Sequence, residues 1–496
     1  MNCACPFRRI VPPLTGGILI AACLWLIIVT AIPADESVLV LQRYGRHLVQ
    51  HHEFSFNQGE RFDGFVDPLW LAVAALPRLF AAPSLPVVRI AALLCALGIF
   101  LTTARLTGPV AAIPAFVIIL CTPPILDTIH TANDMPMITF LLLIALMVRG
   151  HELRRGRINA TLNSGLLFAV AGVAHPWAIM AGAGLTAGSA WSALKKRLPR
   201  LDFFLLFRSW LVPIAAYWCW KLVYFGHVLP PHLAPITFRE LPGRMAAVVF
   251  TTWRVAGPLF IAAVLGGIVA GRRNRLTVTA AVMAGLMLFN LALLPGNGTA
   301  AYTAFTIPFV FAALTAVTGF MFLLKQSPRR WTPLLGIIGM SFLVFHGWRG
   351  ARMPGTALVR VSPRNAIALI TPEAYAAAFH NWLDSAVHDP RIATGAWLES
   401  WLPAKTTIAV AGALGAAVDC HHSVLDLGGE HSPQTASLRS ATDSGRQAAR
   451  FLCNDTEADF LVIAGGMDAA GEFVSNELGR ALHEDSLVNS FYSPLN

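Results

Sequence analysis

The stretch ADESVLVLQRYGRHLVQHHEFSFNQGERFDGFVDPLW, residues 34–70, lies between two strongly apolar segments and is the most informative part of the sequence. It gathers acidic, basic, histidine and aromatic side chains in a protein that is otherwise poor in charge. Its carboxylates are Asp35, Glu36, Glu53, Glu60, Asp63 and Asp67, and its arginines are Arg43, Arg46 and Arg61. Ionisable residues are costly beside hydrocarbon and usually mark a functional site, so we expect the chemistry here.

The composition places the chain among integral membrane proteins. Its 496 residues are 55% hydrophobic and only 13% charged, and the mean hydropathy is +0.60. Windows of about 17 to 25 apolar residues are separated by basic residues, as helices that cross about 30 Å of hydrocarbon require. The sequence therefore predicts an all-α polytopic membrane protein and argues against a soluble globule.

The basic residues predict the orientation. The net charge of +10 comes from Lys and Arg in short loops between apolar windows, which is a topology signal and gives no reason to expect nucleic acid. Arg8 and Arg9 precede the first apolar run, which we interpret as an uncleaved span with a cytoplasmic N-terminus. About eleven spans then place every dense basic loop on one side. They cover residues 15–32, 86–104, 109–123, 137–148, two in 158–194, 203–224, 245–270, 276–294, 303–324 and 331–348.

Two smaller features complete the predicted membrane domain, residues 1–349. The external loop 33–86 carries the acidic pair, and its segment 68–80 is apolar but too short to span, so we expect an interface helix there. A helical hairpin should turn at His175, Pro176 and Trp177, and residues 127–136 should form an external loop.

Residues 350–496 are predicted to be a separate external α/β domain of about 145 residues, long enough for its own core. We expect helices over 371–387 and 441–452, and strands over 406–411, 423–427 and 460–464. The loop 412–415 lacks the GxGxxG pattern of a nucleotide site. Cys420 and Cys453 are interpreted either as a disulfide or as two free thiols, and none of the eight cysteines has zinc-site spacing.

The unusual polar groups outside the opening stretch also fall on the predicted outer face. They are Asp134, His175, Lys221, His227 and His232. Each has a structural alternative: the acidic pair and Asp134 can cap helices, Lys221 can extend its head group to water, and His175 can be a satisfied structural group. A partly desolvated acid pair can remove a proton from an alcohol, and cations can hold a lipid phosphate. This combination suits sugar transfer from a lipid phosphate.

Three motifs follow one another in the opening stretch. The acidic pair Asp35-Glu36 precedes Arg43-Tyr44, then FNQGER at 56–61, and finally GFVDPLW at 64–70. This order resembles the signature of GT-C glycosyltransferases of the terminal arabinofuranosyltransferase type, known from mycobacterial cell-wall synthesis, with bacterial homologues. Weaker similarity extends through Asp134 and Lys221 to residues 408–429, so it covers both predicted domains.

The resemblance implies a GT-C fold and an inverting glycosyltransferase in the bacterial cytoplasmic membrane, with a periplasmic or extracellular C-terminal domain. Its donor would be a polyprenyl-phosphate-linked sugar, and its acceptor an envelope glycan or lipid. Asp35 would be the general base with Glu36 as its partner, and Arg43, Arg61 and Lys221 would contact phosphate or sugar. The other expected substrate-binding residues are Tyr44, Asn57, Glu60, Asp63, Asp67, Trp70, Asp134, His175 and His232. Some GT-C enzymes use a divalent metal, and the carboxylates here could hold one, but they show no recognised metal-ligand spacing, so we expect no cofactor.

The chain departs from the family pattern at three places. Glu36 stands where the family usually has a second aspartate, His175-Pro176-Trp177 replaces an Arg-Pro-acidic motif, and Ile236 replaces a lysine. Two cations that could hold phosphate are therefore missing. An alternative is a catalytically degenerate GT-C-fold protein with a scaffold, envelope or flagellar role. A transporter is a further alternative, but it predicts inverted repeats or polar groups through the membrane depth.

Overall fold

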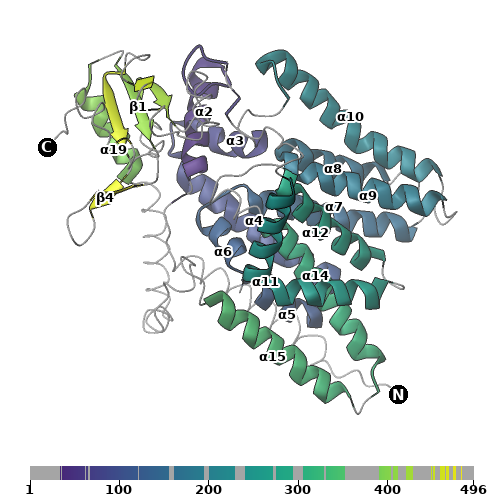
Figure 1. Cartoon of the computed structure of the whole chain (residues 1–496). Coiled ribbons are helices and arrows are strands. Elements are labelled where there is room, and N and C mark those ends of the chain that lie inside the picture. Colours follow the sequence, from purple (N-terminus) through teal and green to yellow (C-terminus); the bar gives the residue numbers. More distant parts are fainter. Residues whose placement is uncertain are drawn as a thin grey trace. The chain divides into compact units, whose positions relative to one another are not determined.

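A computed structural model describes residues 34, 36–61, 63–64, 67–120, 122–155, 161–194, 200–228, 241–271, 275–293, 305–328, 331–351, 390–403, 406–411, 420–427, 448, 451–452, 458–463, 465–467, 473–475 and 482 (Figure 1). The chain divides into two compact units. Unit 1 comprises Met1–Pro33, Arg89–Trp218 and Pro235–Leu383, and unit 2 comprises Ala34–Val88, Cys219–Ala234 and Asp384–Asn496. The opening stretch of the sequence thus belongs to the same unit as the C-terminal residues.

Unit 1 is built from helices. They are α4 (Ser84–Thr107), α5 (Pro109–Leu120), α6 (Pro123–His130), α7 (Met135–Arg155), α8 (Thr161–Ala174), α9 (Pro176–Leu194), α10 (Arg200–Phe225), α11 (Leu241–Gly271), α12 (Arg275–Leu293), α14 (Thr306–Gln326) and α15 (Thr332–Ala351). The start of α4 and the end of α10 belong to unit 2. Five segments of the described chain are long and apolar enough to cross a membrane: Ser84–Thr107, Met135–Leu153, Leu201–Phe225, Leu241–Val269 and Thr306–Gln326. The protein is a multi-pass membrane protein.

Most predicted spans correspond to helices, with two differences between residues 109 and 136. The span expected over 109–123 is wrong as a single crossing, because α5 has 12 residues and rises only about 18 Å. The external loop expected over 127–136 is helical at its start, because α6 runs to His130. Two consecutive prolines, Pro123 and Pro124, open that helix; proline fits the first turn, where its missing N–H costs nothing.

The hairpin turn predicted at His175 is confirmed. Helix α8 ends at Ala174 and α9 begins at Pro176, a residue that fits the first position of a helix. The His175 imidazole Nδ1 accepts a hydrogen bond of 3.2 Å from the Trp177 backbone N–H, while the His175 N–H donates to Ala171 O at 3.0 Å. These local bonds satisfy backbone groups that a helix break would otherwise leave open.

Two glycines allow α11 and α14 to pack closely. A Cβ placed on Gly266 would lie 2.6 Å from the Thr315 carbonyl oxygen, and a Cβ on Gly319 would collide with the Gly266 backbone. Small residues let helix backbones approach in membrane proteins, where dispersion contacts replace the hydrophobic effect as the driving force. The pair therefore fixes the spacing of these two helices.

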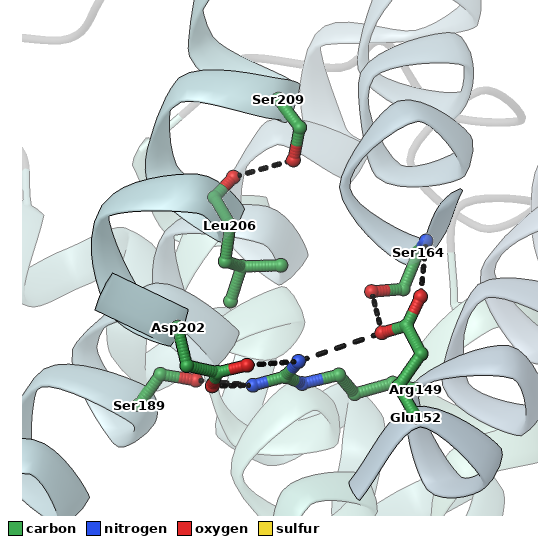
Figure 2. Close-up of polar contacts among 7 residues, drawn as sticks. All are labelled: Arg149, Glu152, Ser164, Ser189, Asp202, Leu206 and Ser209. Atoms are coloured by element: carbon green, nitrogen blue, oxygen red, sulfur yellow. Dashed lines mark hydrogen bonds and ion pairs between the residues drawn. The ribbon is translucent and has the colours of Figure 1, made fainter. Parts of the chain in front are cut away.

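A buried polar network joins four helices of unit 1 (Figure 2). Arg149 on α7 donates two hydrogen bonds to the Asp202 carboxylate on α10, at 3.2 and 2.5 Å, and lies 3.4 Å from Glu152. It also donates to Ser189 on α9. Glu152 in turn accepts from the backbone N–H and the hydroxyl of Ser164 on α8. The two buried carboxylates, Asp202 and Glu152, therefore have charged or hydroxyl partners within hydrogen-bond distance, as the burial of a charge requires.

Unit 2 combines short helices with a small sheet. Its first part contains α2 (Glu36–His51), α3 (Pro68–Ala75) and the 3₁₀ helix η1 (Leu76–Phe80), and its last part contains α19 (Pro390–Trp401). The strands β1 (Thr407–Ala411), β2 (Ser423–Asp426) and β3 (Phe460–Ile463) form a parallel sheet in the order β2-β1-β3. A short antiparallel pair, β4 (Gly465–Met467) and β5 (Phe473–Ser475), follows.

The three strands predicted for the C-terminal part are confirmed, and their parallel pairing is that of an α/β domain. Ala409, Leu425, Leu452 and Leu482 belong to its buried core. The pair β4 and β5 was not predicted, because Gly465 and Gly466 of β4 have low strand propensity and β5 has only three residues. The predicted helix 371–387 and Cys453 lie outside the described residues, and Cys420 is a free thiol.

Candidate functional site

Helix α2 positions the first part of the predicted site. It begins at Glu36, whose carboxylate lies in the first turn, where the helix dipole favours negative charge. Residues 38–47 of the helix are all buried, so it is enclosed on every side over this part, which includes Arg43, Tyr44 and His47. Gly45 lets the helix approach α3, since a Cβ there would lie 3.1 Å from the Ala75 nitrogen. Asp35, the predicted base, lies outside the described residues.

Arg43 is the centre of a buried hydrogen-bond network within unit 2. Its Nε donates to Phe56 O at 2.7 Å, and one terminal nitrogen donates to Cys420 O at 2.8 Å. The other terminal nitrogen donates to Asn57 Oδ1 and to His422 O, both at 3.0 Å. Burial, and then the nearby charge of Arg46, lowers the pKa of Arg43. The guanidinium thus joins α2 both to the FNQGER motif and to the segment before β2.

The Asn57 side chain hydrogen-bonds to the backbone of β2, as a neighbouring strand would. Its Oδ1 accepts a hydrogen bond of 3.0 Å from the Val424 backbone N–H, and its Nδ2 donates to Val424 O at 2.8 Å. The same Nδ2 donates to Glu60 Oε2 at 3.0 Å. Because β2 is an outer strand among the described strands of the sheet, the amide adds hydrogen bonds to the strand at that edge. The motif therefore holds the C-terminal sheet through side-chain chemistry that only Asn or Gln supplies.

Asp63 and Lys221 form a buried ion pair. The Lys221 Nζ lies 2.6 Å from Asp63 Oδ2, and the two side chains are 3% and 0% exposed. The His227 Nε2 lies 3.8 Å from the same oxygen. Burial raises the pKa of Asp63 to about 6, against the opposing effect of Lys221. The Lys221 head group is therefore paired inside the protein and does not extend to solvent, which was the structural alternative for this residue.

An aromatic group surrounds the end of α10. The rings of Trp220 and Tyr224 are stacked with centroids 5.6 Å apart, and Phe54 meets both edge to face. The Arg61 guanidinium lies over the Tyr224 ring at 5.3 Å, and Arg61 is exposed. Aromatic faces attract cations and also suit the apolar faces of sugars and the membrane interface. Arg61 is accordingly the predicted cation that a ligand can reach from solvent.

Other predicted residues have structural contacts. The Asp67 Oδ1 accepts from the backbone N–H groups of Leu69 and Trp70 at 2.8 and 2.9 Å, so it caps α3, and Trp70 is fully buried. Tyr44 is also fully buried, and burial raises its pKa. His47 has its pKa lowered to about 3 by burial and by Arg43 and Arg46, so it is neutral at pH 7.

Three predicted site residues remain: Asp134, His175 and His232. Asp134 and His175 belong to unit 1; Asp134 precedes α7 and its backbone carbonyl accepts from the N–H groups of Met137 and Ile138. His232 and Ile236 lie outside the described residues. Sequence reasoning missed Arg46, whose guanidinium donates to Cys420 O at 2.5 Å, and the acceptor segment Cys420–His422. Of these, only Arg46 could have been found from the sequence, because it lies three residues after Arg43 and therefore on the same side of a helix.

Among the described residues, one group of side chains has donor atoms close enough to hold a metal ion: Glu399, Cys420 and His422. None of the three was a predicted site residue. All three belong to unit 2, where the backbone carbonyl oxygens of Cys420 and His422 also accept hydrogen bonds from Arg43. A metal here would therefore lie next to the network that holds α2.

No protein-family model matches the chain, and no curated protein matches it. Among solved structures, ArnT from Cupriavidus metallidurans bound to undecaprenyl phosphate is 14% identical, with a TM-score of 0.49 over 90% of this chain and 92% of that one. The Archaeoglobus fulgidus oligosaccharyltransferase tethered with an acceptor peptide is 12% identical, with a TM-score of 0.46 over 89% of this chain and 67% of that one.

Proposed function

We propose that the chain is a GT-C membrane glycosyltransferase that transfers a sugar from a polyprenyl phosphate to an envelope glycan or lipid on the outer face of the cytoplasmic membrane. The observation that carries the proposal is the grouping of the motif residues in unit 2. Arg43 and Asn57 come from motifs that resemble the family, and Asp63, which lies between two of these motifs, pairs with Lys221 near the C-terminal end of α10. If the resemblance were due to chance, contacts among these separate segments would not be expected.

In this proposal the reaction is a single displacement at the anomeric carbon. Asp35 removes the proton from an acceptor hydroxyl, and the oxygen attacks the anomeric carbon. The bond from that carbon to the phosphate oxygen breaks, and the polyprenyl phosphate leaves with the bonding electrons. Glu36 is the partner or second candidate for the base, and its place in the first turn of α2 favours the ionised form.

The contacts divide the cations into two roles. The Arg43 guanidinium is buried and occupied by four protein acceptors, so we propose that it positions α2 and does not hold phosphate. Arg61 is exposed beside the aromatic group and is the better candidate for a lipid phosphate. Lys221 supplies positive charge at the same helix end, where Asp63 holds its ammonium group.

The test is transfer of label from polyprenyl phosphate sugars to envelope glycans by the purified full-length protein in liposomes. Asp35→Asn and Glu36→Gln keep the size of each side chain and remove its basicity. Asp127→Asn is the matched control, because it makes the same chemical change in unit 1. We expect transfer by the wild type and the control, and a loss of at least a hundredfold in the base variant, given the usual contribution of a general base.

Full transfer by both acidic variants would show that the assigned base is wrong. Arg61→Gln should raise the donor concentration needed for half-maximal rate, whereas an unchanged requirement would remove Arg61 from the phosphate site. Binding of a polyprenyl phosphate sugar by the wild type without any product would favour the alternative of a degenerate, non-enzymatic relative.

A further inference from the structure

We propose that Glu399, Cys420 and His422 form a zinc-binding site beside the network of Arg43. One carboxylate oxygen, one thiol sulfur and one imidazole nitrogen lie within 4.8 Å of one another. The Nε2 of His422 lies 3.5 Å from Glu399 Oε2. In a tetrahedral zinc site with ligand distances of about 2.1 Å, two ligand atoms lie about 3.4 Å apart. The separation between His422 Nε2 and Glu399 Oε2 therefore already suits a shared zinc ion.

The imidazole of His422 supplies an independent indication of a ligand. Its side chain is only 4% exposed, and Nε2 has no hydrogen-bond partner among the described residues. A buried polar nitrogen without a partner is costly, and in native proteins such an atom commonly binds water or an ion. The same imidazole belongs to the cluster of Glu399, Cys420 and His422, so the unsatisfied group lies where a metal ion could bind.

The thiol is suited to become the second ligand. Cys420 is a fully buried free cysteine, and the His422 backbone hydrogen-bonds to its sulfur. Burial raises the pKa of the Cys420 thiol, and a bound divalent cation reverses such a shift because it deprotonates a coordinating thiol. Arg43 and Arg46 oppose a cation electrostatically, but the thiolate and the Glu399 carboxylate together balance the two charges of zinc.

The carboxylate is held in place from outside the cluster. The His421 backbone N–H donates to Glu399 Oε2 at 2.8 Å, and the His421 Nδ1 lies 3.0 Å from Oε1. Such outer contacts orient metal ligands. The Glu399 side chain is 34% exposed, which leaves a path for the ion and a fourth position for water. A mixed set of sulfur, nitrogen and oxygen ligands favours zinc over magnesium or calcium.

The consequence of zinc binding would be mechanical. The Arg43 guanidinium donates to the backbone carbonyls of Cys420 and His422, the same two residues that would bind the metal through their side chains. Zinc would therefore immobilise the acceptors of Arg43 and tie α19 to α2. This role does not depend on glycosyl transfer.

The test uses the full-length protein, purified in detergent and treated with a chelator, then titrated with Co²⁺ and with Zn²⁺. We expect one equivalent of Co²⁺ to produce a thiolate-to-cobalt absorption band that Zn²⁺ displaces. Cys420→Ser should abolish the band, and His422→Gln and Glu399→Gln should each weaken zinc binding by about 10 to 100-fold. Cys219→Ser changes an exposed cysteine and should have no effect.

A second measurement covers the case in which a core variant does not fold. In the wild type, Zn²⁺ should slow alkylation of Cys420 at least tenfold, measured by peptide mass spectrometry, and leave Cys219 unchanged. Equal alkylation of Cys420 with and without Zn²⁺, or a cobalt band that survives Cys420→Ser, would overturn the proposal. A band lost in Cys219→Ser would place the metal elsewhere and overturn it as well.

Discussion

The Lys221 ammonium lies 2.6 Å from the Asp63 carboxylate, and both side chains are buried within unit 2. Removing one partner of such a pair leaves an uncompensated charge, which typically costs about 3 to 5 kcal/mol. Replacing both partners avoids this penalty. We therefore expect Lys221→Met, which leaves the buried carboxylate without its partner, to lower stability strongly, and the double variant with Asp63→Asn to lose less than the sum of the two single changes.

The measurement is a double-mutant cycle on apparent unfolding free energies of the detergent-solubilised protein. A coupling above about 1 kcal/mol is expected for residues in direct contact. Additive effects of the two substitutions would contradict the buried ion pair.

Stability should depend on pH through Asp63. The folded pKa of about 6 lies above the free value of 3.8, so the folded state holds its proton more tightly. Between these two values only the folded form is protonated, and stability falls as pH rises through the window. The difference corresponds to about 3 kcal/mol, fully present below pH 3.8 and lost above pH 6. Unfolding midpoints from pH 4 to 8 should show this component in the wild type and not in Asp63→Asn; parallel profiles would contradict it.

The Arg149 network should contribute strongly to the stability of unit 1. Arg149→Met leaves the buried Asp202 carboxylate without its two hydrogen bonds from the guanidinium, at a cost of about 3 to 5 kcal/mol. Arg208→Met makes the same change at an exposed position of α10 and should alter stability by less than about 0.5 kcal/mol. Thermal unfolding in detergent distinguishes the two. Similar midpoints for both variants would show that the network is not stabilising.

The contact of α11 with α14 should tolerate no added methyl group. Gly319→Ala places a Cβ against the Gly266 backbone, which cannot shift as a side chain can, so we expect a loss of about 1 to 3 kcal/mol. Gly285→Ala on α12 is the control, because no atom lies within 4 Å of its added Cβ. Alanine favours a helix by about 0.5 to 1 kcal/mol over glycine, so the control should be neutral or more stable. Unfolding midpoints that fall equally would contradict this packing.

The sequence predicted much of the fold from patterns that need no distant contacts. Apolar windows and basic loops indicated a multi-pass membrane protein, and strand propensity located β1, β2 and β3. Length was less reliable where prolines divide an apolar run, as at α5 and α6. Local composition indicates which segments are apolar. The position at which one helix ends and the next begins depends instead on capping by neighbouring residues.

The candidate site was predictable in its residues and much less in their roles. The stretch 34–70 drew attention to Arg43, Asn57 and Asp63, because ionisable and amide groups are unusual beside apolar segments. Sequence reasoning expected Arg43 to contact phosphate or sugar, and only the structure showed that its guanidinium donates to Phe56, Asn57 and the Cys420–His422 segment. The role of Asp35 stays a prediction.

By itself the sequence determined that the chain lies in a membrane, that a polar stretch follows its first apolar run, and that a small α/β domain ends it. Those properties depend on hydrophobicity and local propensity, which neighbouring residues carry. Tertiary structure alone decided that Lys221 pairs with Asp63, that Asn57 completes the edge of β2, and that Glu399 meets Cys420 and His422. Each of these contacts joins residues far apart in the chain, so its partner is fixed by burial and geometry and leaves no periodic signal in the sequence.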